Sequence, residues 1–394
     1  MHDYTKIIKA TTVKDPATGA VNTPIALSST FYQEDFDHFG EFDYSRSGNP
    51  TRKAGEEAVA ALEGGQFGYL FSTGMAAISS VLSIFSQGDH LLVSKFVYGG
   101  TFRILEDVLS RFGITHTFVD PTDLNALEDA IQPNTKAIYI ETPSNPVLAV
   151  TDIPGVVAIA KAHDLITIAD NTFMSPVLQK PLSLGVDIVV HSATKFLSGH
   201  SDILAGAAIT NDPGLASRIY FIQNAFGATL GVTDTFLLLR GIKTLGVRMA
   251  QSSKGAQQLA EWLATQPVVT RVCYPGLKSD PSYAIHQKQA KNGGAVLSFD
   301  VGSAENAKIL AETLTIPEFS VSLGGVESIL SYPAKMSHAE MSAEEQLACG
   351  ITPGLLRFSV GLEDPDDLIA DLAQGFKKIQ AAHSNDTANT VQAG

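Results

Sequence analysis

The 394-residue sequence has few cysteines and no long hydrophobic run. Its two cysteines, Cys273 and Cys349, lie far apart and form no C-x-x-C pattern, which argues against a disulfide framework and against a zinc site. No segment approaches the roughly 18 to 20 consecutive apolar residues of a membrane span, and residues 1–10 lack the apolar stretch of a signal peptide. We therefore expect a cytoplasmic protein with no structural metal and no membrane anchor.

Positive charge is also scarce. Lys and Arg together number 27 against 41 Asp and Glu, which gives a formal net charge of −14. This charge repels the phosphate backbone of nucleic acids and anionic lipids, so a nucleic-acid partner is disfavoured. Any anionic ligand has to be held by a local cluster of hydrogen-bond donors.

Two glycine-rich phosphate signatures are missing as well. The sequence contains neither G-x-G-x-x-G nor G-x-x-x-x-G-K-[ST]. A nicotinamide oxidoreductase is expected to carry the first, with an acidic residue about 20 residues further on. An oxidoreductase of this kind and a P-loop enzyme are therefore disfavoured.

A βαβ rhythm is present after residue 51. Short apolar runs alternate with helical segments, as where FGYLFS precedes GMAAISSVLSIF, and about seven strands result. Several of these runs are apolar on both faces, which predicts an α/β fold with a mostly parallel sheet between layers of helices. Ligands of such sheets bind at the carboxyl ends of the strands.

The same patterns divide the chain into four segments. Residues 1–50 are predicted to form an irregular arm that reaches a neighbouring subunit, and residues 51–245 a large domain that contains the sheet. Residues 246–382 mix strands and helices and predict a smaller α+β domain. Residues 383–394 are small and polar, and we expect a disordered tail.

A lysine and an acid follow two of the apolar strands. Lys195 lies in SATKFLSGHSD, just past VDIVVHS, and Asp170 closes LITIAD. Taken singly, Lys195 could be a solvated loop lysine and Asp170 a helix N-cap. Together they match the needs of pyridoxal phosphate, because a lysine forms the Schiff base and an acid keeps the pyridine nitrogen protonated.

Three further features fit a ligand of this kind. FSTGMAA is a strand–turn–helix in which the backbone N–H groups of Gly74 and Met75 can face a phosphate. Tyr98 follows another strand and either stacks on a flat cofactor and passes protons, or packs in the core. Arg357 alternates with apolar residues, so its guanidinium points to solvent or into a cleft where it can grip a carboxylate.

The chain resembles the Cys/Met-metabolism family of pyridoxal-phosphate enzymes from about residue 10 to residue 380. This family includes cystathionine lyases, cystathionine γ-synthase, methionine γ-lyase and O-acetylhomoserine sulfhydrylase. The resemblance rests on eight motifs in order: YSRSGNPT (44–51), FSTGMAA (71–77), VYGGT (97–101), ETPSNP (141–146), DNTF (170–173), SATKFLSGHSD (192–202), SLGGVES (322–328) and LLRFSVGLED (355–364). It implies fold type I, the aspartate-aminotransferase-like fold, with pyridoxal 5′-phosphate as cofactor.

The resemblance also implies roles for individual residues. Lys195 is the Schiff-base lysine and proton carrier, Asp170 is the partner of the pyridine nitrogen, and Tyr98 is the stacking ring and a candidate acid. The phosphate is bound by Gly74, Met75, Ser192 and Thr194, and by Tyr44 and Arg46 of the adjacent subunit. The substrate α-carboxylate is bound by Asn145, Ser322 and Arg357. Shared sites of this kind imply a homodimer, usually paired into a homotetramer.

Three positions bear on the substrate. Gly100 stands where methionine γ-lyases, by the same resemblance, carry Cys, and Asp43 matches an acid near the distal ammonium of cystathionine. Val321 argues against recognition of the distal ammonium, because several cystathionine γ-lyases and γ-synthases have Glu at this position. We favour a lyase that cleaves cystathionine by α,γ-elimination to cysteine, 2-oxobutanoate and ammonia, with β-elimination to homocysteine and pyruvate as a side or co-principal reaction. β-Lyase, γ-synthase, sulfhydrylase and methionine γ-lyase activities stay open, and a non-catalytic binding protein is disfavoured by the complete residue set.

Overall fold

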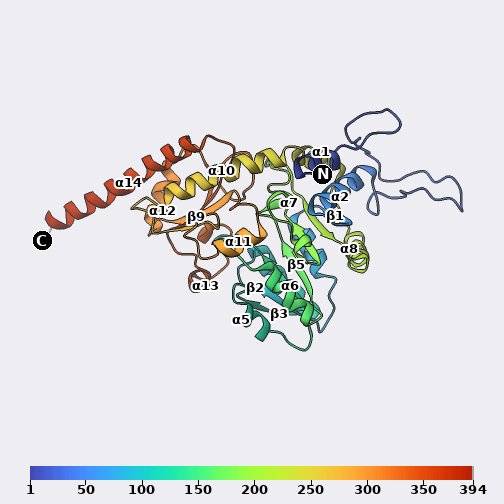
Figure 1. Cartoon of the computed structure of the whole chain (residues 1–394), viewed down its shortest axis with the longest axis horizontal. Helices are drawn as coiled ribbons and strands as arrows, with labels where there is room; N and C mark the ends of the chain where they lie inside the picture. Colours follow the sequence, from blue (N-terminus) through green and yellow to red (C-terminus); the bar gives the residue numbers. More distant parts are fainter. Residues whose placement is uncertain (393–394) are drawn as a thin grey trace. The chain divides into compact units, whose positions relative to one another are not determined.

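The structure is a computed structural model that describes residues 1–392, with side chains as far as residue 384. By its internal contacts the chain divides into two units (Figure 1). Unit 1 comprises residues 1–142 and 151–247, and unit 2 comprises residues 143–150 and the chain from residue 248 onward. The short segment 143–150, which carries the end of the ETPSNP motif, thus groups with unit 2.

Unit 1 is built on a seven-stranded sheet with the order β1-β7-β6-β5-β4-β2-β3. Its strands are β1 (Phe67–Phe71), β2 (His90–Ser94), β3 (Thr115–Val119), β4 (Thr135–Glu141), β5 (Ile166–Asp170), β6 (Ile188–His191) and β7 (Gly206–Thr210). Only β7 runs against the others, since its pairings with β1 and β6 are antiparallel and the remaining pairs are parallel. The predicted mostly parallel seven-stranded sheet is confirmed.

The helices of unit 1 start and stop where the sequence provides caps. They are α1 (Asp3–Ala10), α2 (Pro50–Glu63), α3 (Gly74–Leu82), α4 (Gly99–Arg103), α5 (Leu124–Asp129), α6 (Ile153–Ala162), α7 (Ser175–Leu178), α8 (Pro213–Phe226) and α9 (Val232–Ile242), with shorter turns η1 (Ile104–Val108), η2 (Leu109–Phe112) and η3 (Pro181–Leu184). The side chain of Asn49 accepts hydrogen bonds from the first turn of α2, and Thr73 caps α3 in the same way. These two caps fix where the helices begin.

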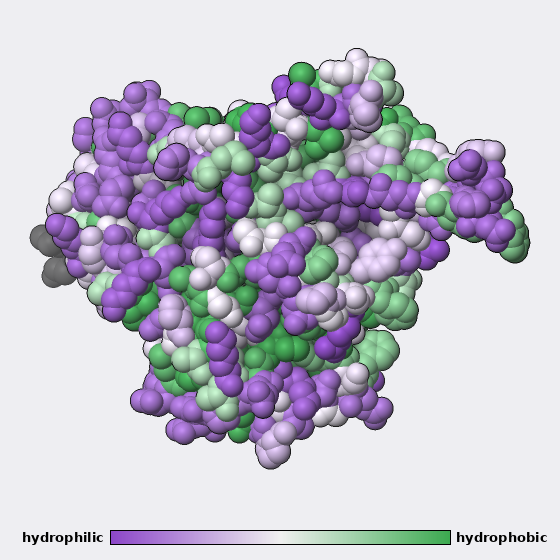
Figure 2. Space-filling model, turned by 45° about the vertical axis from the view of Figure 1, so that its right-hand side comes forward, coloured by the Kyte–Doolittle hydropathy of each residue, from purple (hydrophilic) through white to green (hydrophobic). Residues whose placement is uncertain are grey.

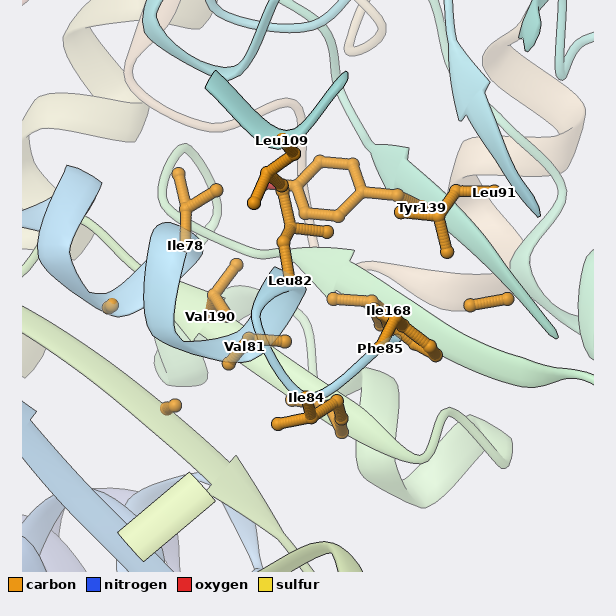
Figure 3. Close-up of a cluster of buried hydrophobic side chains, with 14 of the residues drawn as sticks. Ile78, Val81, Leu82, Ile84, Phe85, Leu91, Leu109, Tyr139, Ile168 and Val190 are labelled. Carbon is orange, nitrogen blue, oxygen red and sulfur yellow. The ribbon is translucent and has the colours of Figure 1, made fainter. Parts of the chain in front are cut away.

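The core of unit 1 lies between the sheet and its helices. In Figure 3, Tyr139 of β4, Ile168 of β5 and Val190 of β6 lie in one cluster with Ile78, Val81 and Leu82 of α3. Each of these strand residues lies one or two positions before the end of its strand. The residues at the strand ends are therefore held by a closely packed core.

Unit 2 contains a five-stranded sheet with the order β10-β11-β12-β9-β8. Its strands are β8 (Arg271–Cys273), β9 (Val296–Asp300), β10 (Glu318–Phe319), β11 (Ile329–Ser331) and β12 (Leu355–Ser359), and only β10 and β11 pair in parallel. Its helices are α11 (Tyr283–Gln289), α12 (Ala304–Thr313), α13 (Ala343–Ala348) and α14 (Pro365–Gln392), with the turn η4 (Pro333–Lys335), and α10 (Leu245–Leu263) contains the boundary between the units. The predicted smaller strand–helix domain is present.

The two ends of the chain differ. Between α1 and α2 the chain is mostly irregular and forms the two long blue loops at the right of Figure 1. At the other end, α14 continues to Gln392 through the segment expected to be disordered, and residues 393–394 lie outside the described residues. None of the helices that the structure describes is both long and apolar enough to cross a membrane.

Candidate active site

One edge of the unit 1 sheet gathers the residues that the sequence singles out. Asp170 is the last residue of β5, Lys195 follows the end of β6 by four residues, and Tyr98 follows the end of β2 by four. Gly74 opens α3 shortly after β1. Because β1, β2, β5 and β6 point the same way, their carboxyl ends share one edge of the sheet, where ligands of α/β folds bind.

The Asp170 carboxylate is buried, with 7% of the residue exposed. Its Oδ1 accepts hydrogen bonds from the backbone N–H of Thr172 at 2.9 Å and from the Thr172 hydroxyl at 2.5 Å. Burial raises the pKa of Asp170, while these two hydrogen bonds and the charge of His191 act in the opposite direction. The next helix, α7, begins only at Ser175, so Asp170 is not a helix N-cap. A buried acid in this position is suited to a cationic partner.

Lys195 is half-buried in the turn after β6, so it is not a solvated surface lysine. Its backbone N–H donates to the carbonyl of Ser192 at 3.1 Å, and its own carbonyl accepts from Gly199 at 2.8 Å. Three hydrogen bonds also join Thr194 to Ala205: the Thr194 N–H and hydroxyl both donate to the Ala205 carbonyl, and the hydroxyl accepts from the Ala205 N–H. The backbone around the lysine is therefore fixed on both sides.

The start of α3 fits an anion. The first N–H groups of a helix, here those of Gly74 and Met75, have no partner within the helix and carry the positive end of its dipole. A Cβ at Gly74 would lie 2.8 Å from the Cβ of Ser192, so a glycine is needed for the helix to approach this residue so closely. Gly74, Met75 and Ser192 thus form a close-packed cradle at the positive end of α3, where an anion is favoured.

Tyr98 lies at the entrance to α4 with 43% of its surface exposed, which excludes a core role. Its backbone N–H donates to Oε2 of Glu141 at 2.9 Å. Glu141 ends β4 and stands opposite Asp170 in the register of the two strands. Sequence reasoning missed Glu141, although it closes an apolar strand in the same way as Asp170.

A second cluster lies within unit 2 around Arg357 of β12, which is 3% exposed. Its Nη1 donates to Oδ1 of Asn145 at 2.8 Å, and its Nη2 donates to the Ser322 carbonyl at 2.5 Å and to the Ser331 hydroxyl at 3.0 Å. Ser322 has a φ of 82°, a left-handed conformation that costs energy for a residue with a side chain. The structure thus brings together Asn145, Ser322 and Arg357, the three residues expected at the substrate carboxylate.

His338 is an additional member of this second cluster. It is buried, and its pKa is lowered to about 4, first by burial and then by the charge of Arg357. Its ring bonds the backbone of Asn145, and Nδ1 lies 2.8 Å from the Ser337 hydroxyl. A neutral imidazole therefore supports Asn145 without repelling the guanidinium further. No sequence pattern indicated this role.

The predicted arm residues are not part of either cluster. Asp43, Tyr44 and Arg46 are all exposed. Arg46 donates to the Asn224 carbonyl at 3.0 Å and its guanidinium lies 5.5 Å from the centre of the Tyr44 ring, while Asp43 accepts from the Tyr44 N–H. These contacts join the arm residues to one another and to α8.

The model of the family "Cys/Met metabolism PLP-dependent enzyme" matches residues 4–377. The chain therefore belongs to this family of fold type I enzymes, and its cofactor is pyridoxal 5′-phosphate. The residues present fit this cofactor, since unit 1 offers a lysine, a buried acid and an anion cradle at one sheet edge.

The relatives are enzymes of cystathionine chemistry. The chain is 58% identical to the protein called cystathionine beta-lyase MetC of Bacillus subtilis (strain 168), over 93% of this chain and 94% of that protein. It is 45% identical to the cystathionine gamma-lyase of the same organism, over 96% and 100% of the two chains. A crystal structure of cystathionine gamma-lyase from Lactobacillus plantarum complexed with L-serine superposes with a TM-score of 0.94 at 45% identity, covering 96% and 100%. The chain is thus a PLP-dependent lyase of this family.

Proposed function

We propose that this chain is a cystathionine lyase whose principal reaction is β-elimination, which releases homocysteine, pyruvate and ammonia. The observation that carries this choice is the 58% identity to a cystathionine beta-lyase over nearly the full length of both chains. This shifts the preference from the γ-elimination that the sequence alone favoured. γ-Elimination stays as the second candidate because a gamma-lyase is 45% identical over 96% of the chain.

The residues of unit 1 supply the proton transfers. When bound, the cofactor withdraws electrons from the substrate α-carbon. Lys195 would hold the cofactor through its amine and would take the proton from the substrate Cα, and Asp170 would keep the ring nitrogen protonated. Tyr98 would hold the flat ring of the cofactor, and its hydroxyl would give a proton to the departing sulfur.

Each unit contains a set of residues for one anionic group. Gly74, Met75, Ser192 and Thr194 hold the cofactor phosphate through backbone N–H groups and hydroxyls. Arg357, with Asn145 and Ser322, binds the substrate α-carboxylate, and the hydrogen bonds of its guanidinium fix the orientation of this group in advance.

The arm completes the site of a second copy. Tyr44 and Arg46 reach the phosphate of the adjacent subunit, and Asp43 faces the distal ammonium of cystathionine there. The exposure of large side chains supports this proposal: Tyr32 is 89% exposed and Phe36 91%, on a segment that projects at the right of Figure 2. We infer a homodimer, paired into a homotetramer.

Gly100 argues against methionine as the main substrate. A Cβ at this position would lie 2.6 Å from Sδ of Met75 and 2.7 Å from Cε1 of Tyr98. A cysteine there would have to displace the Tyr98 ring or the Met75 side chain, so this position favours glycine.

Product analysis tests the proposal. Purified protein is incubated with cystathionine, and the keto acid is identified by chromatography. Pyruvate with homocysteine supports β-elimination, 2-oxobutanoate with cysteine supports the second candidate, and failure to release either keto acid would refute the lyase. Methionine, and O-acetylhomoserine with sulfide, serve as competing substrates, and faster turnover of either one would overturn the choice of cystathionine.

A further inference from the structure

A buried acid–imidazole pair lies beside the strand-edge cluster. Glu63, the last residue of α2, places Oε1 2.6 Å from Nε2 of His191, the last residue of β6. None of the Glu63 side chain and 1% of that of His191 is exposed. Both residues lie outside the eight sequence motifs, and the reaction described above uses neither.

Two nitrogen atoms face one oxygen of Glu63. Oε1 is hydrogen-bonded to Nε2 of His191 and accepts from Nδ2 of Asn171 at 2.8 Å. Oε2 is buried and has no hydrogen-bond partner among the residues that the structure describes. An ionised carboxylate can accept from both neighbours at Oε1, so the arrangement suits a Glu63 carboxylate that faces a protonated Nε2 of His191.

This pair is tied to Asp170 through the next residue of the chain. Asn171 donates its backbone N–H to the Val190 carbonyl at 3.0 Å, and its side chain bonds both Glu63 and the Gln179 carbonyl. Gln179 in turn donates to Oδ1 of Asn171 at 3.1 Å. The ends of β5 and β6 are thus joined by backbone and by side chains at the residue that follows Asp170.

We propose that Glu63 and His191 are positioning residues for the cofactor: the Glu63 carboxylate holds His191 as a buried cation, and this cation keeps Asp170 ionised and oriented towards the pyridine nitrogen. The inference rests on the proposed role of Asp170. It agrees with the charge of His191 opposing the effect of burial on the pKa of Asp170. The other titratable groups that face Asp170 come from β4, namely Tyr139, which bears on the same pKa, and Glu141, opposite it in the register. A cation is needed because burial alone favours the neutral acid, which cannot hold a pyridinium by charge.

Charge-neutral replacements test this role. Glu63→Gln keeps the size of the side chain and an acceptor oxygen, and His191→Gln keeps a donor near the position of Nε2. We expect each single variant, and the double variant, to bind pyridoxal phosphate about tenfold more weakly, because Asp170 then loses a charge that favours its ionised form. The dissociation constant is measured by equilibrium dialysis, and the visible absorption of the bound cofactor is followed against pH.

The double variant separates charge from packing. It restores a hydrogen-bonded neutral pair, so a merely structural role predicts wild-type cofactor affinity and a wild-type pH profile of the absorption band. Either result would overturn the proposal. Glu57→Gln, an exposed carboxylate on the same helix, is the matched control and should change neither quantity.

Two measurements keep the outcomes distinguishable. Thermal unfolding of each apoprotein shows whether the variant folds. If a single variant does not fold, the cofactor affinity of the double variant is used to separate charge from packing. If the wild-type protein binds the cofactor but releases no keto acid from cystathionine, the proposed function fails while the affinity test of Glu63 and His191 still stands. If the wild type is active and the variants match it in cofactor affinity, the inference alone fails.

Discussion

The residues of the two buried clusters and those of the arm differ in how the chain supports them. Asp170 is 7% exposed and Arg357 3%, and each is fixed by hydrogen bonds from its own unit. Tyr44 is 44% exposed, and Arg46 is held by one carbonyl of α8 and by the Tyr44 ring. The buried residues are thus organised before any ligand arrives, whereas the arm residues lack a comparable environment.

This difference indicates which parts of the site a single chain can build. Groups that must hold a proton or a charge in a defined place need burial and several hydrogen bonds, which a packed core supplies. Groups that close the site can come from an exposed segment that becomes ordered against a second copy. Replacing a buried residue should therefore abolish turnover or ligand binding. The loss caused by replacing an arm residue should be restored by a subunit that carries an intact arm.

The largest effect is expected at Lys195. Lys195→Ala removes the amine that binds the cofactor and moves the Cα proton, so turnover of cystathionine should fall by more than about a thousandfold. Borohydride reduction should no longer attach the cofactor to the protein. Lys161→Ala, on the exposed face of α6, is the control and should behave as wild type. Retention of a reducible cofactor bond in the Lys195 variant would contradict the assignment.

A smaller effect is expected at Arg357, which we propose binds the substrate α-carboxylate. Arg357→Lys keeps the charge but loses the planar set of donors that Asn145, Ser322 and Ser331 orient. We expect kcat/KM for cystathionine to fall about a hundredfold, chiefly through KM, as steady-state kinetics can measure. Arg271→Lys on β8, whose guanidinium is exposed, should leave KM unchanged. A change in kcat alone would place Arg357 elsewhere in the reaction.

Glu56 lies beside Arg52 in α2, and its titration is expected to change the free energy of unfolding by about 2 kcal/mol. Burial raises the pKa of Glu56 from 4.5 to about 6, although the charge of Arg52 lowers it. Arg52 also donates to the carbonyls of Ser45 and Arg46, so this pair anchors the arm to α2. The native state binds the proton more tightly than the unfolded chain does. The contribution of Glu56 to the unfolding free energy therefore decreases as pH rises from 4.5 to 6 and stays low above that.

Glu56→Gln removes this titration. Relative to wild type, the unfolding free energy of the variant should rise by roughly 1 to 2 kcal/mol between pH 4.5 and pH 7, measured by urea denaturation at several pH values. Glu57→Gln serves again as the exposed control and should give parallel curves. Parallel curves for the Glu56 variant would mean that this carboxyl titrates as it does in the unfolded chain.

The sequence predicted the sheet well because strands buried on both faces are recognisable as continuous apolar runs. LITIAD and KAIYIE became β5 and β4 with their polar ends at the expected edge. It did not predict that residues 143–150 group with unit 2, because this depends on tertiary packing that no local pattern reports. It also placed the first ten residues in an irregular arm, where α1 forms.

The candidate site was predictable where a residue interrupts an apolar pattern. Lys195, Asp170 and Arg357 each stand out in this way, and the family resemblance added the others. Glu63 and His338 were missed for a physical reason: each contacts a residue more than 100 positions away in the chain, and a single acid or histidine in a helix or turn gives no periodic signal. Such supporting residues become visible only when the contacts are known.

The arm is expected to give the smallest change in turnover. It also offers the most direct test of the difference between buried and exposed residues. Arg46→Ala should impair phosphate binding in the neighbouring subunit, while Lys195→Ala inactivates its own. Random exchange of subunits between the two variants makes about half of the dimers mixed, and each mixed dimer has one intact site. The mixture should therefore recover about a quarter of wild-type turnover, whereas each variant alone stays well below that. If Arg46 acted within its own chain, each mixed dimer would hold one Lys195-deficient and one Arg46-deficient site, and mixing would restore nothing.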